Sequence, residues 1–214
     1  MRSRHAWIAV GAFALVLVAI ATSAGSAAAV IGRCQPWEGY RVVGQGGESV
    51  VLVRNRPGEQ TVQVCHKASG RRMRPEQDIG IRGNNDFDQE LIGVRFRGPY
   101  VVYNWDSPED DCGYSGLQLI NTRAGYETSL ESRECGYADD FEPVIVKRSG
   151  TVAWTFGRTI YACEAACRTD RRARRSHPAR IIADGPTVRP STLRATPRGI
   201  TWRQGSRARY ARLR

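Results

Sequence analysis

Four segments of similar pattern recur at almost constant spacing, and they constrain the fold of this chain more than any other feature. The segments are residues 42–52, 93–103, 144–154 and 192–202. Their last residues, which we call the anchors, are Leu52, Tyr103, Trp154 and Trp202, at steps of 51, 51 and 48 residues. A β-branched residue stands two positions before each anchor, and a glycine or proline interrupts each segment earlier. Residues two apart share one face of a strand, and glycine and proline favour turns. Each segment therefore predicts a strand, a turn and a second strand.

A third run of β-forming residues follows three of the anchors, at 61–65, 117–121 and 159–163. Each unit is then expected to be an antiparallel meander that buries its apolar face only by stacking against its neighbours. We expect one domain over residues 30–214. Its units are expected at about 40–80, 90–135, 143–185 and 190–214.

The units resemble blades of WD40-like and TolB-like secreted bacterial β-propellers. In those blades a G-x-φ-φ-x-W strand precedes a strand ending in a D/T-x-x-G turn, and residues 66–70 and 121–125 form two matching turns here. The resemblance implies an all-β, propeller-like array of about four short antiparallel blades. Propellers usually close with four to eight blades, so we expect a small ring, an open arc or an assembly completed by a second chain.

Two alternatives to this architecture stay open at the level of sequence. Residues 35–40 are a candidate strand that would complete the last unit. A β-sandwich of short strands is also compatible with the alternation of apolar and polar residues.

The N-terminus predicts export. A short basic segment precedes the apolar stretch 6–20, and a run of small residues ends at Ala29. This order is typical of a signal peptide, here 1–29, cleaved near Ala29. The apolar stretch is shorter than the ~20 residues of a transmembrane helix, although an uncleaved anchor is the alternative. We expect the mature chain to be secreted, periplasmic or otherwise extracytoplasmic.

All six cysteines lie after the predicted signal peptide. An even number in an exported chain favours three disulfides over metal ligation or free thiols. If each bond stays within its own unit, the pairs are Cys34–Cys65, Cys112–Cys135 and Cys163–Cys167. The sequence leaves the other pairings open.

No catalytic motif stands out, and we interpret His66 and His177 as surface imidazoles.

Three acidic segments, 84–90, 107–112 and 137–142, supply oxygen ligands of the kind that calcium prefers. The candidate ligands are Asp86, Asp88, Asp110, Asp111, Asp139 and Asp140. Solvated turns are the alternative, and two such carboxylates are also what an exported glycoside hydrolase would need. Calcium is the one cofactor that the sequence raises.

Positive charge gathers in the C-terminal third of the chain. Residues 30–148 hold 15 basic and 18 acidic groups, whereas residues 149–214 hold 15 arginines and three acids. The candidates for contact with an anionic partner are Arg171, Arg172, Arg174 and Arg175. A solvated loop is the alternative reading of this run. Nucleic acid is not expected as the partner, because the run has no interleaved aromatic residues.

These features favour an exported, non-catalytic binding or scaffold protein that presents loops to an extracytoplasmic protein or glycan. Trp37, Trp105 and Tyr114 lie outside the repeated pattern and are candidate contact residues. One alternative is an exported hydrolase that uses carboxylates. Another is a protein that binds a polyanion or the envelope surface through its arginine-rich third. An open array would also permit oligomers.

Overall fold

The regular structure of the described chain consists of β-strands. The computed structural model describes residues 31–37, 39–56, 59–76, 79, 81–82, 90–91, 93–107, 114–134, 141–164 and 179–213. Within these residues the strands form four larger antiparallel sheets and one small two-stranded sheet. The prediction of an all-β fold is confirmed.

Each larger sheet is built from consecutive strands, in chain order. The first sheet contains β1 (Tyr40–Gly46), β2 (Ser49–Arg56), β3 (Glu59–His66) and β4 (Arg72–Met73). The second contains β7 (Arg95–Arg97), β8 (Tyr100–Ser107), β9 (Tyr114–Asn121) and β10 (Tyr126–Glu134). The small sheet of β5 (Ile81–Arg82) and β6 (Glu90–Leu91) lies between them in the sequence.

The third and fourth sheets continue the same order. The third sheet contains β11 (Ile145–Val146), β12 (Val152–Phe156), β13 (Thr159–Cys163) and β14 (Arg180–Ala183). The fourth contains three strands, β15 (Val188–Thr196), β16 (Gly199–Gln204) and β17 (Arg207–Arg212). In all four sheets the first strand pairs with the second through a tight turn.

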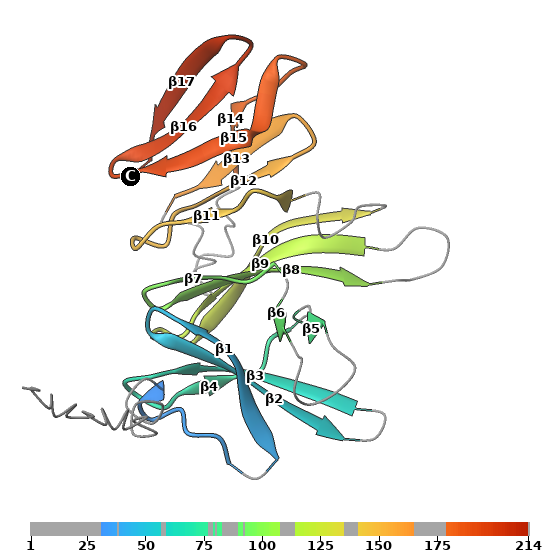
Figure 1. Ribbon diagram of the computed structural model, residues 1–214, viewed down its shortest axis with the longest axis vertical. Coiled ribbons are helices and arrows are strands. Elements are labelled where there is room, and N and C mark those ends of the chain that lie inside the picture. Colours follow the sequence, from blue (N-terminus) through green and yellow to red (C-terminus); the bar gives the residue numbers. More distant parts are fainter. Residues whose placement is uncertain are drawn as a thin grey trace, which may run out of the picture.

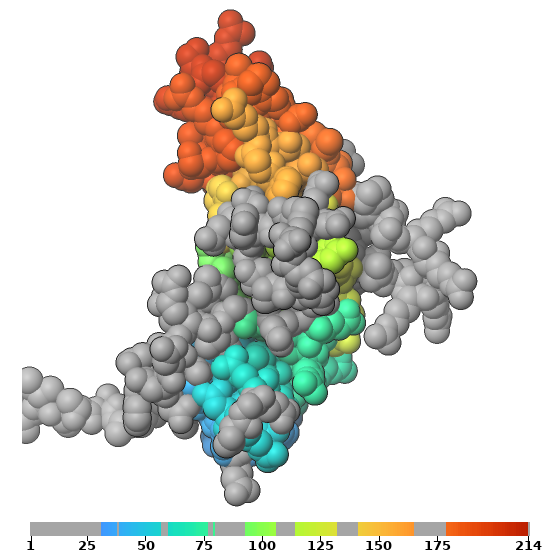
Figure 2. All heavy atoms as spheres, turned by 90° about the vertical axis from the view of Figure 1, so that its right-hand side faces the viewer, coloured from blue at the N-terminus to red at the C-terminus, as the bar shows by residue number. Residues whose placement is uncertain are grey.

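The four sheets follow one another along the long axis of the molecule. Figure 1 shows the first sheet at one end and the fourth at the other, and the side view in Figure 2 shows the same progression from blue to red. The first and fourth sheets therefore do not meet, and none of the sheets closes on itself. The two-sheet sandwich alternative is wrong, because four separate larger sheets are present.

The four anchors occupy corresponding positions. Each lies in the second strand of its sheet, and each is buried: Leu52, Tyr103 and Trp154 fully, Trp202 to 93%. Tyr103 packs in the layer between the first and second sheets, Trp154 between the second and third, and Trp202 between the third and fourth. Each of these three side chains thus points toward the preceding sheet.

The residue two positions before each anchor lies in the same apolar cluster as that anchor. These residues are Val50, Val101, Val152 and Ile200. This is the result of the two-residue period of a strand, which puts alternate side chains on one face. The odd-numbered neighbours in the first sheet, Val51 and Val53, face the second sheet instead. Each inner sheet therefore contributes to two apolar layers.

The outer side of the first sheet is covered by the chain that precedes it. Leu52 packs there with Val50, Tyr40 and the disulfide between Cys34 and Cys65. Tyr40 begins β1, and Arg72 Nη2 donates a hydrogen bond to the carbonyl oxygen of Gln35 at 2.8 Å. The alternative in which residues 35–40 add a strand to the last unit is therefore wrong, because this segment lies on the first sheet.

Candidate anion-binding site

The turns that join first to second strands gather on one side of the molecule, the left side in Figure 1. Two hollows open beside these turns. One, of about 490 Å³, lies among the first three sheets, and the other, of about 520 Å³, lies among the second, third and fourth. Phe96, Arg97 and Arg148 line both hollows. We call the joined space the basic groove.

The groove is lined by residues of five turns and the strand ends beside them. Residues of the first hollow are Gly47, Glu48, Phe96, Arg97, Gly98, Pro99, Tyr100, Arg123 and Arg148. The second adds Arg95, residues 144–147 and residues 195–197. Each hollow by itself has a volume in the range of small-molecule sites. No single sheet could form it, because each contributes only one wall.

Glu48 is the one carboxylate among these lining residues, and it is already paired. Arg123 Nη2 donates to both of its oxygens, at 2.8 and 2.6 Å, and His66 Nε2 lies 3.1 Å from Oε2. Burial opposes ionisation of Glu48, but the hydrogen bonds and charges of His66 and Arg123 lower its pKa below the ordinary value. Glu48 therefore stays charged and is compensated by Arg123.

Arg95 is also compensated. Its Nη2 donates to Oε1 of Glu142 at 2.9 Å, and Oε2 of Glu142 accepts the backbone N–H of Val144 at 3.2 Å. This ion pair joins β7 to the segment that leads into β11. It leaves the adjoining wall of the groove with no net charge.

Three cations of the groove have no carboxylate partner in the described part of the chain. They are Arg97, Lys147 and Arg148. The guanidinium groups of Arg97 and Arg148 belong to exposed residues, whereas Lys147 Nζ donates to the carbonyl oxygen of Pro197 at 3.3 Å. Guanidinium groups bind phosphate, sulfate and carboxylate groups through paired N–H donors. The groove is thus suited to an anionic ligand.

The sequence carries a signal for this site in the position of two arginines relative to the anchors. Arg97 and Arg148 each stand six residues before an anchor, Tyr103 and Trp154 respectively. Because the anchors occupy equivalent positions, two arginines at the same offset lie at equivalent turns of neighbouring sheets. The same offset gives Gly46 in the first unit and Thr196 in the fourth. The positive charge is therefore confined to the middle of the groove.

Two aromatic side chains support the groove. Phe96 packs so closely on Gly46 that a Cβ at that glycine would lie 2.4 Å from Phe96 Cβ. Gly150 has a φ of +86°, and a Cβ there would lie 2.6 Å from the ring of Tyr100. The Tyr100 hydroxyl donates to the carbonyl oxygen of Ser149 at 3.3 Å. The glycines let neighbouring sheets approach and so fix both rings against the turns.

His66 is buried, so its interpretation as a surface imidazole is wrong. Its Nδ1 lies 2.9 Å from the hydroxyl of Ser69 and its Nε2 faces Glu48. Ser, His and Glu in contact resemble a catalytic triad. However, the Ser69 hydroxyl also accepts the backbone N–H of Arg71, and neither Ser69 nor His66 lines the groove. The three residues instead fasten the 66–70 turn to the β1–β2 turn.

A second surface feature surrounds Trp37, whose side chain is 53% exposed. The guanidinium carbon of Arg72 lies 3.5 Å from the centroid of its ring, and Tyr40 contacts it edge-on at 5.7 Å. A hollow of about 570 Å³ adjoins Trp37, Arg54 and Asn55. Tyr114 is also exposed, whereas Trp105 is buried. Two of the three candidate contact aromatics thus reach solvent.

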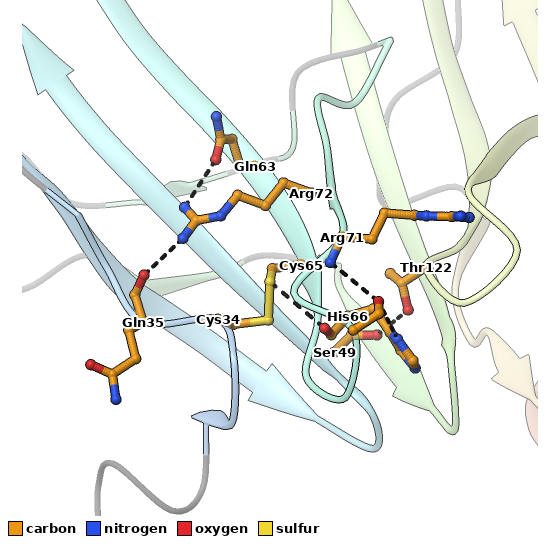
Figure 3. The surroundings of a disulfide bond; sticks show 10 residues. Cys34, Gln35, Ser49, Gln63, Cys65, His66, Arg71, Arg72 and Thr122 are labelled. Atoms are coloured by element: carbon orange, nitrogen blue, oxygen red, sulfur yellow. Dashed lines mark hydrogen bonds between the residues drawn. A yellow bond between two sulfur atoms is a disulfide. The ribbon is translucent and has the colours of Figure 1, made fainter.

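The disulfide holds this feature in place. Cys34 and Cys65, the pair expected within the first unit, are joined, and Figure 3 shows Arg72 reaching from β4 to Gln35 and Gln63 beside them. Cys163 is disulfide-bonded as well, with a partner outside the described residues. The pairings Cys112–Cys135 and Cys163–Cys167 each involve residues that are not described.

Most of the other candidate residues lie outside the described part of the chain. They are the calcium candidates Asp86, Asp88, Asp110, Asp111, Asp139 and Asp140, the arginines Arg171, Arg172, Arg174 and Arg175, His177, and the signal-peptide segment 1–29. Among the described residues, no group of three or more His, Cys, Asp or Glu side chains is placed to hold a metal ion. The described part also contains no helix long and apolar enough to span a membrane.

The geometry defines an all-β protein of four stacked antiparallel sheets with a basic groove beside their turns. Comparison with protein-family models, with curated proteins and with solved structures finds no match. The functional assignment therefore depends on the site itself.

Proposed function

We propose that this chain is an exported, non-catalytic binding protein that holds a small anionic ligand in the basic groove. The observation that carries the proposal is the set of three cations, Arg97, Lys147 and Arg148, that line one hollow without a carboxylate partner in the described chain. These three positive charges repel one another, and an anion bound among them would offset that repulsion. A phosphate, sulfate or carboxylate group would complete the site.

The surroundings of the groove support binding rather than reaction. The described residues that line it include no histidine, cysteine or serine, and both oxygens of Glu48 are already in hydrogen bonds. The second carboxylate nearby, Glu142, is bonded to Arg95. A carboxylate-dependent hydrolase needs two such groups facing one substrate. The described part of the groove offers no such pair, so the hydrolase alternative is less favoured.

The proposal also includes the location of the protein and the arrangement of its four sheets. The predicted signal peptide and the disulfide between Cys34 and Cys65 are both compatible with an extracytoplasmic location, because disulfides persist in oxidising compartments. We further propose that the four sheets are blade-like units of an open, propeller-like arc, similar to part of a WD40-like or TolB-like propeller. In such an arc the first-strand turns surround the ligand, as the basic groove would require.

The test is calorimetric titration of the protein, purified after export, with matched charged and neutral sugars. Glucose 6-phosphate and glucuronate are the anionic probes, and glucose is the neutral one. We expect the anionic probes alone to bind. We expect Arg97→Gln/Arg148→Gln to weaken this binding at least about tenfold, since a hydrogen bond to a charged group contributes about 1.5–3 kcal/mol and 1.4 kcal/mol is tenfold.

The control is Arg33→Gln/Arg74→Gln, which makes the same change of net charge at exposed residues that lie outside the strands, just before β1 and just after β4. This variant should bind the anionic probes like the wild type. Equal affinity in the wild type and Arg97→Gln/Arg148→Gln would refute the proposal. Equal weakening in both double variants would also refute it, because net charge alone would then explain the binding.

A further inference from the structure

The fourth sheet ends the stack and leaves one of its faces uncovered by the described chain. Trp202 and Ile200 point toward the third sheet, so Thr201 and Arg203, which alternate with them in β16, point away. Residues directly opposite in an antiparallel pair share a face. The register therefore places Arg194 and Tyr210 beside Thr201, and Arg189 beside Arg203. Arg212, opposite Gly199, lies on the same side.

We call this surface the terminal face. It consists of Arg189, Arg194, Thr201, Arg203, Ala208, Tyr210 and Arg212. All of these residues are exposed except Thr201, which is partly buried. The fourth sheet lies at the extreme end of the stack in Figures 1 and 2, beyond which no described sheet follows.

The terminal face is strongly basic and has no compensating acid. Residues 188–213 contain seven arginines and neither aspartate nor glutamate. None of the four arginines on the face forms an ion pair with a described carboxylate. Arg194 Nη1 donates to the carbonyl oxygens of Ser191 and Leu193, both at 2.8 Å. Its remaining guanidinium nitrogens stay available for a ligand.

The arrangement of these charges is unfavourable for folding. Arg189 and Arg203 are directly opposite each other in β15 and β16, where Cβ atoms are about 4.5–5.5 Å apart and like charges destabilise the pair. A polar end face keeps a stack of sheets soluble, but a mixture of both signs would do so without this repulsion. The single sign of the charge thus points to an anionic partner.

We propose that the terminal face binds a linear anionic polysaccharide. Successive residues on the face of a strand are about 6.6 Å apart, so Arg203, Arg194 and Arg212 present guanidinium groups in three successive rows. A polymer with a phosphate, sulfate or carboxylate group on each sugar repeat can contact several of them at once. Each guanidinium group can pair two of its N–H donors with one anionic group.

Tyr210 favours a polysaccharide over a membrane. Its side chain is 52% exposed and lies in the middle row, beside Thr201. An aromatic ring with a hydroxyl offers both an apolar face for a sugar ring and a hydrogen-bonding tip. Membrane docking is strengthened by large apolar side chains that enter the lipid, and the terminal face has none besides Tyr210. The choice of an extracellular polymer rests on the proposed export, whereas the site is separate from the basic groove.

The test measures binding of the protein, purified after export, to dextran sulfate, with uncharged dextran as the neutral match, at several concentrations of NaCl. We expect binding to dextran sulfate alone, with an affinity that falls as salt rises. Arg189→Gln/Arg194→Gln/Arg203→Gln should lose at least tenfold in affinity and show a shallower salt dependence. Tyr210→Ala should weaken binding to dextran sulfate but leave binding to inorganic polyphosphate unchanged.

Two controls separate this proposal from others. Arg33→Gln/Arg56→Gln/Arg74→Gln makes the same change of net charge at exposed residues in β2 or next to the strands of the first sheet and should bind normally. Arg97→Gln/Arg148→Gln should keep the part of dextran sulfate binding that Arg189→Gln/Arg194→Gln/Arg203→Gln loses, and that triple variant should bind glucose 6-phosphate like the wild type, so failure of the groove and failure of the terminal face are distinguishable. Equal loss in both triple variants would overturn the proposal. Binding to anionic phospholipid vesicles that exceeds binding to dextran sulfate and needs the same arginines would also overturn it, in favour of a membrane.

Discussion

Nη2 of Arg123, in the turn between β9 and β10, lies 2.6 Å from Oε2 of Glu48, in the turn between β1 and β2. This ion pair bridges the first and second sheets. Beside it the Ser49 and Thr122 hydroxyls are 2.9 Å apart, and the backbone N–H of Glu48 donates to the carbonyl oxygen of Gly98. The contact between these two sheets thus combines an apolar layer with a polar rim at the groove.

Glu48 should make stability depend on pH in the acid range. Because its pKa is lowered in the folded protein, Glu48 contributes stability that is present above the unfolded value near 4.5 and is lost as the pH falls through the folded value. We therefore expect the free-energy difference between the wild type and Glu48→Gln to shrink below about pH 4.5. Urea unfolding at pH 7, 5, 4 and 3 measures it. A difference that stays constant over this range would contradict the assignment.

Glu127 should show the opposite dependence. Burial raises its pKa, against the lowering effect of hydrogen bonds from the Tyr103 hydroxyl and the backbone N–H of Glu76. The folded state then holds the proton more strongly than the unfolded state, so stability is lost as the pH rises from about 4.5 through the folded pKa. Glu127→Gln should gain in stability relative to the wild type over that rise. The same urea series measures this change, and parallel curves would contradict it.

The sequence predicted those parts of the fold in which local chemistry and packing agree. Turn glycines and the β-branched residues two positions before each anchor predicted a first and a second strand in each unit. The structure pairs these two strands in all four larger sheets. Strand β10 was missed. It is an edge strand, and its sequence, residues 126–134, holds only two large apolar side chains, Tyr126 and Leu130, so its apolar period is weak.

An aliphatic residue also stands nine positions before each anchor (Val43, Val94, Ile145 and Leu193), but these four residues do not occupy equivalent layers. Val43 and Val94 pack in the layer between the first two sheets, although they belong to different sheets. Ile145 and Leu193 likewise share the layer between the third and fourth sheets. In β1 the register shifts at Val43, and one residue of shift moves a side chain to the other face.

The basic groove and the terminal face depend on tertiary arrangement. Arg97 and Arg148 are 51 residues apart and meet only because neighbouring sheets stack in register. Arg189 and Arg203 meet only through the pairing of β15 with β16. The sequence did predict positive charge in the C-terminal third, but it placed the contact at residues 171–175. Residues 171–175 lie outside the described part, so that prediction stays untested, and the described chain shows a further basic surface at residues 189–212.

Trp154 should be the most sensitive of the anchors. It is fully buried between the second and third sheets and stacks on Tyr161, with ring centroids 5.8 Å apart. Trp154→Ala should cost about 3–5 kcal/mol of unfolding free energy. Trp154→Phe should cost clearly less, because it retains most of the ring and removes an indole Nε1 that has no hydrogen-bond partner in the described structure. Guanidinium unfolding measures both, and equal losses would contradict the packing argument.

Loss of the Cys34–Cys65 disulfide should lower the unfolding free energy of the protein, because this bond holds the N-terminal segment on the outer side of the first sheet. Its cysteines are 31 residues apart in sequence, and the chain-entropy relation gives a stabilisation of about 3–4 kcal/mol for a loop of this length. Cys34→Ser/Cys65→Ser should lose most of that free energy in urea unfolding. The same change releases residues 31–37 from β3, so the emission of Trp37 should shift to that of a solvated indole.

Arg72→Gln separates the two effects. It removes the guanidinium that lies over Trp37 and donates to Gln35, but it leaves the disulfide intact. We expect this variant to change the fluorescence of Trp37 with a loss of about 1 kcal/mol or less, since a cation–π contact at an exposed site contributes about 0.5–1 kcal/mol. Because the chain has five tryptophans, both variants are compared with Trp37→Phe, and the Trp37 signal is the difference. If Arg72→Gln destabilised the protein as much as loss of the disulfide, then the segment would be held by Arg72 rather than by the covalent bond.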